Sequence, residues 1–179
     1  MIDAECSTFI FPTIIYGLDA NHLLFIAANG LKGPLPSEIC ALTSLQRITL
    51  SENEISGMLP DCLPDMSGLL KLDVVTNNMS GELPPSLFNA TSLRRLLLFG
   101  NSFSGTLPTE IGMLESMTAL LLQSNNFQGT IPSELANVTR LGKFIYHNKN
   151  NDCIMHTWYK LKVSQLRFTL FMNEKYSTV

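Results

Sequence analysis

A period of 24 residues runs through most of this 179-residue chain and limits the folds open to it. Three residue types keep the step independently, so chance does not explain it. A chain that repeats at this length stacks its repeats into a solenoid, because a single repeat cannot bury its own apolar side. The positions that hold the period are Asn29, Asn53, Asn77, Asn101 and Asn125; Gly33, Gly57, Gly81, Gly105 and Gly129; and Pro36, Pro60, Pro84, Pro108 and Pro132.

Apolar residues complete the frame of each repeat, which reads LxxLxLxxNxLxGxLPxxLxxL. The L-x-L spacing, as in Ile48/Leu50, puts two apolar side chains on one face of a short strand and the residue between them on the other. Stacked repeats pair these strands into a parallel sheet. The Asn amide can donate and accept hydrogen bonds to backbone groups of adjacent repeats, so the asparagines form a predicted structural ladder. Gly allows a left-handed backbone, and Pro fixes φ and ends the local segment.

The G-x-[LI]-P element, as in Gly57-Met58-Leu59-Pro60, distinguishes a subclass of such repeats. With the full frame it resembles the plant-type leucine-rich repeat, found in ectodomains of plant receptor-like kinases and receptor-like proteins. The resemblance covers roughly residues 21–146. It implies an α/β solenoid, a right-handed leucine-rich repeat superhelix with a concave parallel β-sheet and short strands or 3-10 turns on the convex side. We expect about five repeats in residues 21–148.

Both ends are less regular than the middle. Pro12 lies 24 residues before Pro36, so residues 1–20 are predicted to be a degenerate N-terminal half-repeat or cap. The opening is acidic and unlike a secretory signal, which we do not expect here. Residues 149–179 are either a degenerate C-terminal repeat, with a strand near 166–171, or a non-repeat tail. Cys40 and Cys62 lie 22 residues apart; a bridge between them is geometrically possible, but buried free thiols are favoured.

The sequence carries no catalytic motif: it has no nucleophile elbow, phosphate loop, kinase signature or paired metal motif. We therefore expect no enzymatic activity, no metal site and no small-molecule cofactor. The net charge of −3 gives no global basic field, so nucleic acid is not expected as a partner. No apolar stretch approaches the eighteen residues or so of a transmembrane helix.

The face of the sheet turned away from the core is the usual ligand surface of this architecture. One column there is basic in four of six repeats, and an apolar patch lies beside it. Such a patch needs an explanation, because monomers rarely expose large apolar areas. We interpret it as a docking surface for a peptide, a protein ligand or a co-receptor; the competing interpretation is a sheet with no ligand, or one covered by another part of the chain. The predicted binding residues are Arg47, Lys71, Arg95, Lys143, Val75, Leu97, Phe99, Leu121 and Ile145.

In some receptors of this type an R-x-R pair on one strand holds the carboxylate of the ligand. That pair is missing here, because Arg47 is followed by Thr49, and the adjacent Arg94 and Arg95 are expected to face opposite ways.

Three N-x-[ST] triplets begin at Asn78, Asn89 and Asn137, and the last two are two periods apart. Together with the resemblance, they predict glycosylation in a full-length parent and an extracellular or cell-surface location as part of a larger membrane protein. The sequence thus favours a non-catalytic recognition module. The alternatives are a secreted inhibitor of microbial wall-degrading enzymes, similar to polygalacturonase inhibitors, an intracellular scaffold, and a truncated fragment.

Overall fold

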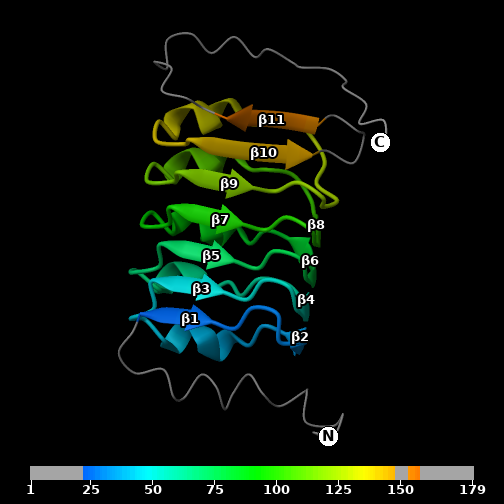
Figure 1. Ribbon diagram of the computed structural model, residues 1–179. Coiled ribbons are helices and arrows are strands. Elements are labelled where there is room, and N and C mark those ends of the chain that lie inside the picture. The colour runs from blue at the N-terminus through cyan, green and yellow to red at the C-terminus, as the bar shows by residue number, and fades with distance from the viewer. Residues whose placement is uncertain (1–21, 148–152, 158–179) are drawn as a thin grey trace, which may run out of the picture.

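Stacked coils form the molecule, and each coil adds one strand to a long sheet (Figure 1). The computed structural model describes residues 22–147 and 153–157. The seven strands of this sheet lie in the order β1-β3-β5-β7-β9-β10-β11. They are β1 (Leu23–Phe25), β3 (Arg47–Thr49), β5 (Lys71–Asp73), β7 (Arg95–Leu97), β9 (Ala119–Leu121), β10 (Lys143–His147) and β11 (Cys153–Thr157).

The register of this sheet follows the sequence period. From β1 to β10 neighbouring strands are parallel and pair residues 24 positions apart, as in Arg47 with Lys71 and Lys71 with Arg95. The last pair differs, because β11 runs antiparallel to β10 and places Thr157 opposite Lys143. The chain therefore turns back after β10 instead of starting another parallel coil there. The strand predicted near 166–171 and the segment 1–20 lie outside the described residues.

A second parallel sheet runs along one side of the stack in the order β2-β4-β6-β8. Its strands are β2 (Lys32–Pro34), β4 (Glu54–Gly57), β6 (Asn78–Glu82) and β8 (Ser102–Ser104). Gly33, Gly57 and Gly81 lie in these strands, Gly105 directly follows β8, and Gly129 follows Gln128, which forms an isolated bridge with Thr106. All five have positive φ, between 76° at Gly129 and 87° at Gly33, a conformation that side chains with a Cβ rarely adopt.

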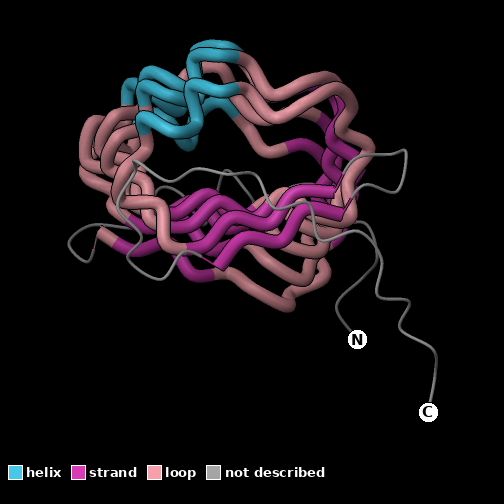
Figure 2. Tube along the Cα trace, turned by 90° about the horizontal axis from the view of Figure 1, so that it is seen from above, coloured by secondary structure: helices cyan, strands magenta, loops and turns pink. Residues whose placement is uncertain are grey.

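Short 3-10 helices form the third side of each coil, opposite the long sheet (Figure 2). They are η2 (Ser37–Ala41), η3 (Leu63–Asp65), η4 (Pro85–Asn89), η5 (Thr109–Met113) and η6 (Ser133–Asn137). Four of them begin directly after a periodic proline, whose extended backbone ends the preceding segment. These elements confirm the leucine-rich repeat solenoid predicted from the period. Within the described ranges, no helix is long and apolar enough to span a membrane.

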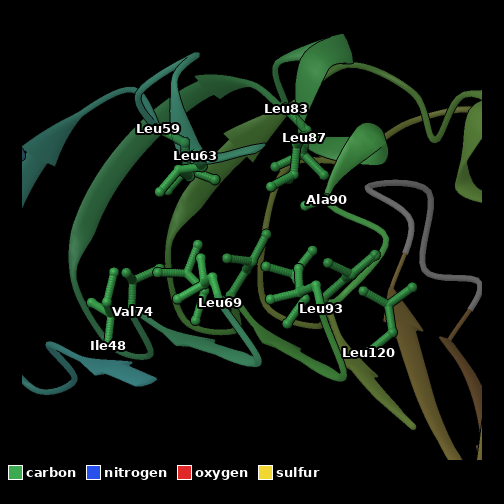
Figure 3. Close-up of a cluster of buried hydrophobic side chains, with 14 of the residues drawn as sticks. Ile48, Leu59, Leu63, Leu69, Val74, Leu83, Leu87, Ala90, Leu93 and Leu120 are labelled. Carbon is green, nitrogen blue, oxygen red and sulfur yellow. The ribbon is translucent and has the colours of Figure 1, made fainter. Parts of the chain in front are cut away.

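The apolar frame residues fill the space between the long sheet and the 3-10 helices (Figure 3). Ile48 and Val74 point inward from the sheet side, and Leu63 and Leu87 point toward them from the helices. All four side chains are fully buried. Because each coil buries this surface against its neighbours, the core is continuous along the stack.

The asparagine column joins successive coils. Asn77 donates from Nδ2 to the carbonyl oxygens of Leu50 (2.9 Å) in the preceding coil and Val74 (3.1 Å) in its own. Its Oδ1 accepts a hydrogen bond from the backbone N–H of Ile55 at 2.9 Å. Equivalent bonds to the preceding coil are made by Asn53, Asn101 and Asn125. These amides satisfy backbone groups that would otherwise be buried without partners.

A disulfide joins Cys40 in η2 to Cys62, the residue before η3, with their Cα atoms 5.9 Å apart. The expectation of free thiols at these positions is therefore wrong. Adjacent coils bring the two residues within the Cα separation that a disulfide requires, although they are two residues out of the 24-residue register.

Candidate interaction surface

Three columns of side chains face away from the core on the long sheet, and we call this surface the outer face. Figure 1 looks onto it. Each column takes one residue from each coil, and the first two are aligned by the pairing of β1 to β10. The first column is Leu23, Arg47, Lys71, Arg95, Ala119 and Lys143; the second is Phe25, Thr49, Asp73, Leu97, Leu121 and Ile145; the third is Ala27, Ser51, Val75, Phe99 and Gln123.

The predicted apolar patch is more shielded than expected. Leu121 is only 8% exposed, and the four other members are half-buried: Val75, Leu97, Phe99 and Ile145. Neighbouring strands lie about 4.8 Å apart, so these side chains pack against one another along the stack. The most open apolar side chain on the outer face is Phe25 in β1, at 76% exposure. The partner-binding role of the patch stays a prediction.

The basic residues of the first column differ in whether they form an ion pair. Lys71 forms an ion pair with Asp73, with Nζ and Oδ2 2.9 Å apart, and both side chains are largely buried. Arg47, Arg95 and Lys143 are exposed, and no ion pair involves them within the described residues. Three of the four predicted basic positions are therefore available to a partner.

A shallow depression of about 560 Å³ lies over β1, β3, β5 and β7 on the outer face. Arg94 lines it together with Arg95, although strand alternation predicts that adjacent residues face opposite ways. The alternation does not apply, because Arg94 lies before β7 and outside the strand. Sequence reasoning therefore missed this residue. The full lining is Leu23, Leu24, Phe25, Arg47, Thr49, Leu70, Lys71, Arg94, Arg95 and Thr118.

Charge is segregated between the outer face and the rest of the stack. Residues 22–147 contain seven Lys or Arg and ten Asp or Glu. Four of the seven cations lie in the first column, and Arg94 beside it makes five. Of the ten acids, Asp73 alone is in the three columns. The outer face is thus positive on a solenoid whose residues 22–147 carry a formal net charge of −3 (7 − 10).

One polar atom on the outer face lacks a partner. The Oε1 atom of Gln123, in the third column, is buried and accepts no hydrogen bond within the described residues. Buried carboxamide oxygens are normally satisfied, so this atom is an exception within the described residues.

The three predicted glycosylation positions lie away from the outer face. Asn78 begins β6 in the second sheet, while Asn89 and Asn137 end η4 and η6. All three residues are exposed.

The described residues hold no cluster of three His, Cys, Asp or Glu side chains suited to a metal ion. Burial raises the pKa of Tyr146 above its usual value, and the hydroxyl donates to the carbonyl oxygen of Gln128 at 3.0 Å. This side chain belongs to the core, where it stacks on Phe127 and Phe144. It takes no part in the outer face.

Comparison with known protein families identifies the same kind of repeat that the 24-residue period indicates. The family model described as Leucine Rich Repeat matches residues 44–66, 92–114 and 116–138. These segments each begin before a strand of the long sheet and end after the following 3-10 helix. The chain is a plant-type leucine-rich repeat protein.

Its structural neighbours are ectodomains of plant membrane receptors. The repeat protein is similar to the plant peptide hormone receptor RGFR1 in complex with RGF2, with 31% identity and a TM-score of 0.68 over 72% of this chain. It is similar to the ectodomain of the receptor kinase GASSHO1/SCHENGEN3 from Arabidopsis thaliana in complex with CASPARIAN STRIP INTEGRITY FACTOR 2, with 32% identity and a TM-score of 0.65 over 70% of this chain. The Arabidopsis receptor kinase HAESA, in complex with the peptide hormone IDA and the co-receptor SERK1, is 39% identical, with a TM-score of 0.62 over 64%.

This repeat protein spans only part of those receptors: 21% of the RGFR1 chain, 14% of the GASSHO1 chain and 19% of the HAESA chain. No curated protein sequence matches the chain.

Proposed function

We propose that the repeat protein is a non-catalytic recognition module of the receptor-like type, which binds a peptide or protein partner through its outer face. The observation that carries the proposal is the depression over β1 to β7, where Arg47, Arg94 and Arg95 adjoin the apolar side chains of Leu23 and Phe25. Backbone pairing of the short strands and the asparagine column fix the backbone positions from which these side chains project. A rigid grid loses little conformational entropy when a partner binds.

The relatives support the same class of function. Three of the receptors it resembles are described in complexes: RGFR1 with RGF2, GASSHO1/SCHENGEN3 with CASPARIAN STRIP INTEGRITY FACTOR 2, and HAESA with the peptide hormone IDA and the co-receptor SERK1. We infer that the partner of this repeat protein is likewise a peptide, a protein ligand or a co-receptor. We propose an extracellular or cell-surface location as part of a larger membrane protein. The Cys40–Cys62 disulfide favours that location over an intracellular scaffold, because such bonds persist in oxidising compartments.

An unbiased selection tests the binding face. Random twelve-residue peptides displayed on yeast are selected on the purified protein, and the recovered peptides are titrated against two variants. Phe99→Asp puts a charge into the half-buried patch of the outer face, and Met113→Asp makes the same chemical change at an exposed position of η5. We expect affinity to fall at least about tenfold for Phe99→Asp, because a desolvated apolar contact is lost. Affinity for Met113→Asp stays within about twofold of the parent.

Both variants are first compared with the parent by circular dichroism, so that unfolding is not mistaken for lost binding. Peptides that bind Phe99→Asp as tightly as the parent, and lose binding to Met113→Asp, would place the recognition surface on the helical side and overturn the proposal.

A further inference from the structure

The exposed cations of the first column have a regular spacing that the sequence period alone does not reveal. Arg47, Lys71, Arg95, Ala119 and Lys143 occupy equivalent positions in consecutive strands. Lys71 is neutralised by Asp73, and Ala119 carries no charge. The available cations of the first column are therefore Arg47, Arg95 and Lys143, one in every second strand, and we call these three residues the cation row.

The distance between members of the cation row follows from sheet geometry. Adjacent strands lie about 4.8 Å apart, so backbone positions two strands apart are separated by about 9.6 Å. A polyproline II chain has three residues per turn and rises about 3.1 Å per residue, so every third side chain lies on one side at intervals of about 9.3 Å. The spacing of the cation row and the spacing of the polyproline II side chains therefore agree to within about 0.3 Å per step.

Other backbone conformations fit the cation row less well. A β-strand presents alternate side chains about 6.7 Å apart, which matches neither one strand spacing nor two. An α-helix returns to one face every seven residues, about 10.5 Å, and drifts by about 1 Å at each step.

We propose that the repeat protein binds an extended acidic peptide segment that carries a carboxylate at every third residue, with its carboxylates paired to Arg47, Arg95 and Lys143. The proposal rests on the proposed function and adds the chemistry and spacing of the partner. Charge complementarity supports it, because the outer face holds most of the cations of the described solenoid and only one acid, which is already paired. The half-buried apolar side chains of the second and third columns flank the row and provide contacts for the residues between the carboxylates.

Synthetic peptides test the spacing directly. The probe is a fluorescein-labelled peptide with the core Glu-Pro-Pro-Glu-Pro-Pro-Glu, in which proline sets the polyproline II conformation. The comparison peptide has the same composition with its three glutamates adjacent, and a third peptide has Gln in place of each Glu. Binding is measured by fluorescence anisotropy in 50 mM salt, where surface charges are weakly screened. We expect the spaced peptide to bind about fivefold more tightly than the clustered one and the Gln peptide to bind weakest.

Variants show which residues hold the carboxylates. Arg95→Glu replaces an attraction with a repulsion and should weaken binding of the spaced peptide about tenfold. The matched control is Arg140→Glu, because Arg140 is an exposed arginine in the turn between η6 and β10, outside the sheet. The affinity of this variant for the spaced peptide should stay within about twofold of that of the parent.

Asp73→Asn tests the neutralisation of Lys71. This substitution frees the ammonium group of Lys71 as a fourth available cation between Arg47 and Arg95. The clustered peptide should then bind more tightly, and the difference in affinity between the clustered and the spaced peptide should become smaller.

Each result bears on the proposal. Equal affinity for spaced and clustered peptides, no detectable binding of the spaced peptide, or unchanged binding by Arg95→Glu would overturn it. The proposed function fails separately: if library peptides bind the outer face but carry no regular acidic spacing, the acidic partner is wrong and the recognition surface stands. If library peptides bind only the helical side, both fail.

Discussion

At the scale of single residues, two adjacent positions shape the turn after each strand of the long sheet: the periodic asparagine and the residue before it. The asparagines satisfy backbone groups of neighbouring coils through the hydrogen bonds of Asn53, Asn77, Asn101 and Asn125. The residue before each asparagine was not singled out, yet it lies in the left-handed region in five coils. These residues are Ala28, Glu52, Thr76, Gly100 and Ser124. Only one of them is a glycine, so residue type gave no signal; the turn after the strand imposes the conformation.

Replacing different asparagines of the column should lower the free energy of unfolding by different amounts. Asn77→Ala should lower the free energy of unfolding by about 3 kcal/mol, because it leaves the buried N–H of Ile55 without its acceptor and takes one of two asparagine donors from the carbonyls of Leu50 and Val74. Asn29→Ala should cost less than about 1 kcal/mol, since Asn29 is exposed and, among the residues that the structure describes, its side-chain amide bonds Ala27 of its own coil alone. Urea denaturation followed by circular dichroism measures both. Equal losses for the two variants would show that cross-coil bonding is not what the asparagine provides.

At the scale of elements, local exceptions to the period escaped prediction. β11 runs antiparallel to β10, and η3 has three residues where the other 3-10 helices have five. Repeat frames describe what the coils share, and such departures depend on contacts between neighbouring coils. The disulfide is an instance: a spacing of 22 residues argued against it, but stacking of η2 and η3 brings the two cysteines together.

The disulfide should stabilise the first coils. Cys40→Ala/Cys62→Ala should lower the free energy of unfolding by about 3 kcal/mol, because a closed loop of this length restricts the unfolded chain. The urea midpoint of the parent should fall on addition of a reductant, and that of the double variant should not. A parent midpoint that is insensitive to reductant would show that the bridge contributes nothing.

The helical side is the predicted location of two glycans. Asn89 and Asn137 end η4 and η6 at equivalent positions two coils apart and are exposed. When the chain is secreted from insect cells behind an added signal, Asn89→Gln should remove one glycan mass and leave binding by the outer face unchanged. Intact-mass spectrometry checks the first expectation and peptide titration the second. An identical mass for parent and Asn89→Gln would show that this position is not used.

At the scale of the whole molecule, the sequence predicted the solenoid, the sheet and the identity of the outward columns. It did not predict the depression or which cations are available. Both depend on local contacts: Asp73 neutralises Lys71 within the same strand, β5, and Arg94 lies directly before β7 and outside it. Leu121 was expected to face solvent, and its neighbours bury it instead. The period fixes which residues share a column, and contacts between columns decide their exposure and charge.

Site-specific photocrosslinking shows whether the outer face is the recognition surface that we propose. Benzoylphenylalanine is placed at Ser51, in the third outward column, and in a second protein at Met113, in η5 on the helical side. Each is irradiated with a peptide recovered from the random library. We expect a covalent adduct from position 51 and none from position 113. An adduct from position 113 alone would contradict the proposal.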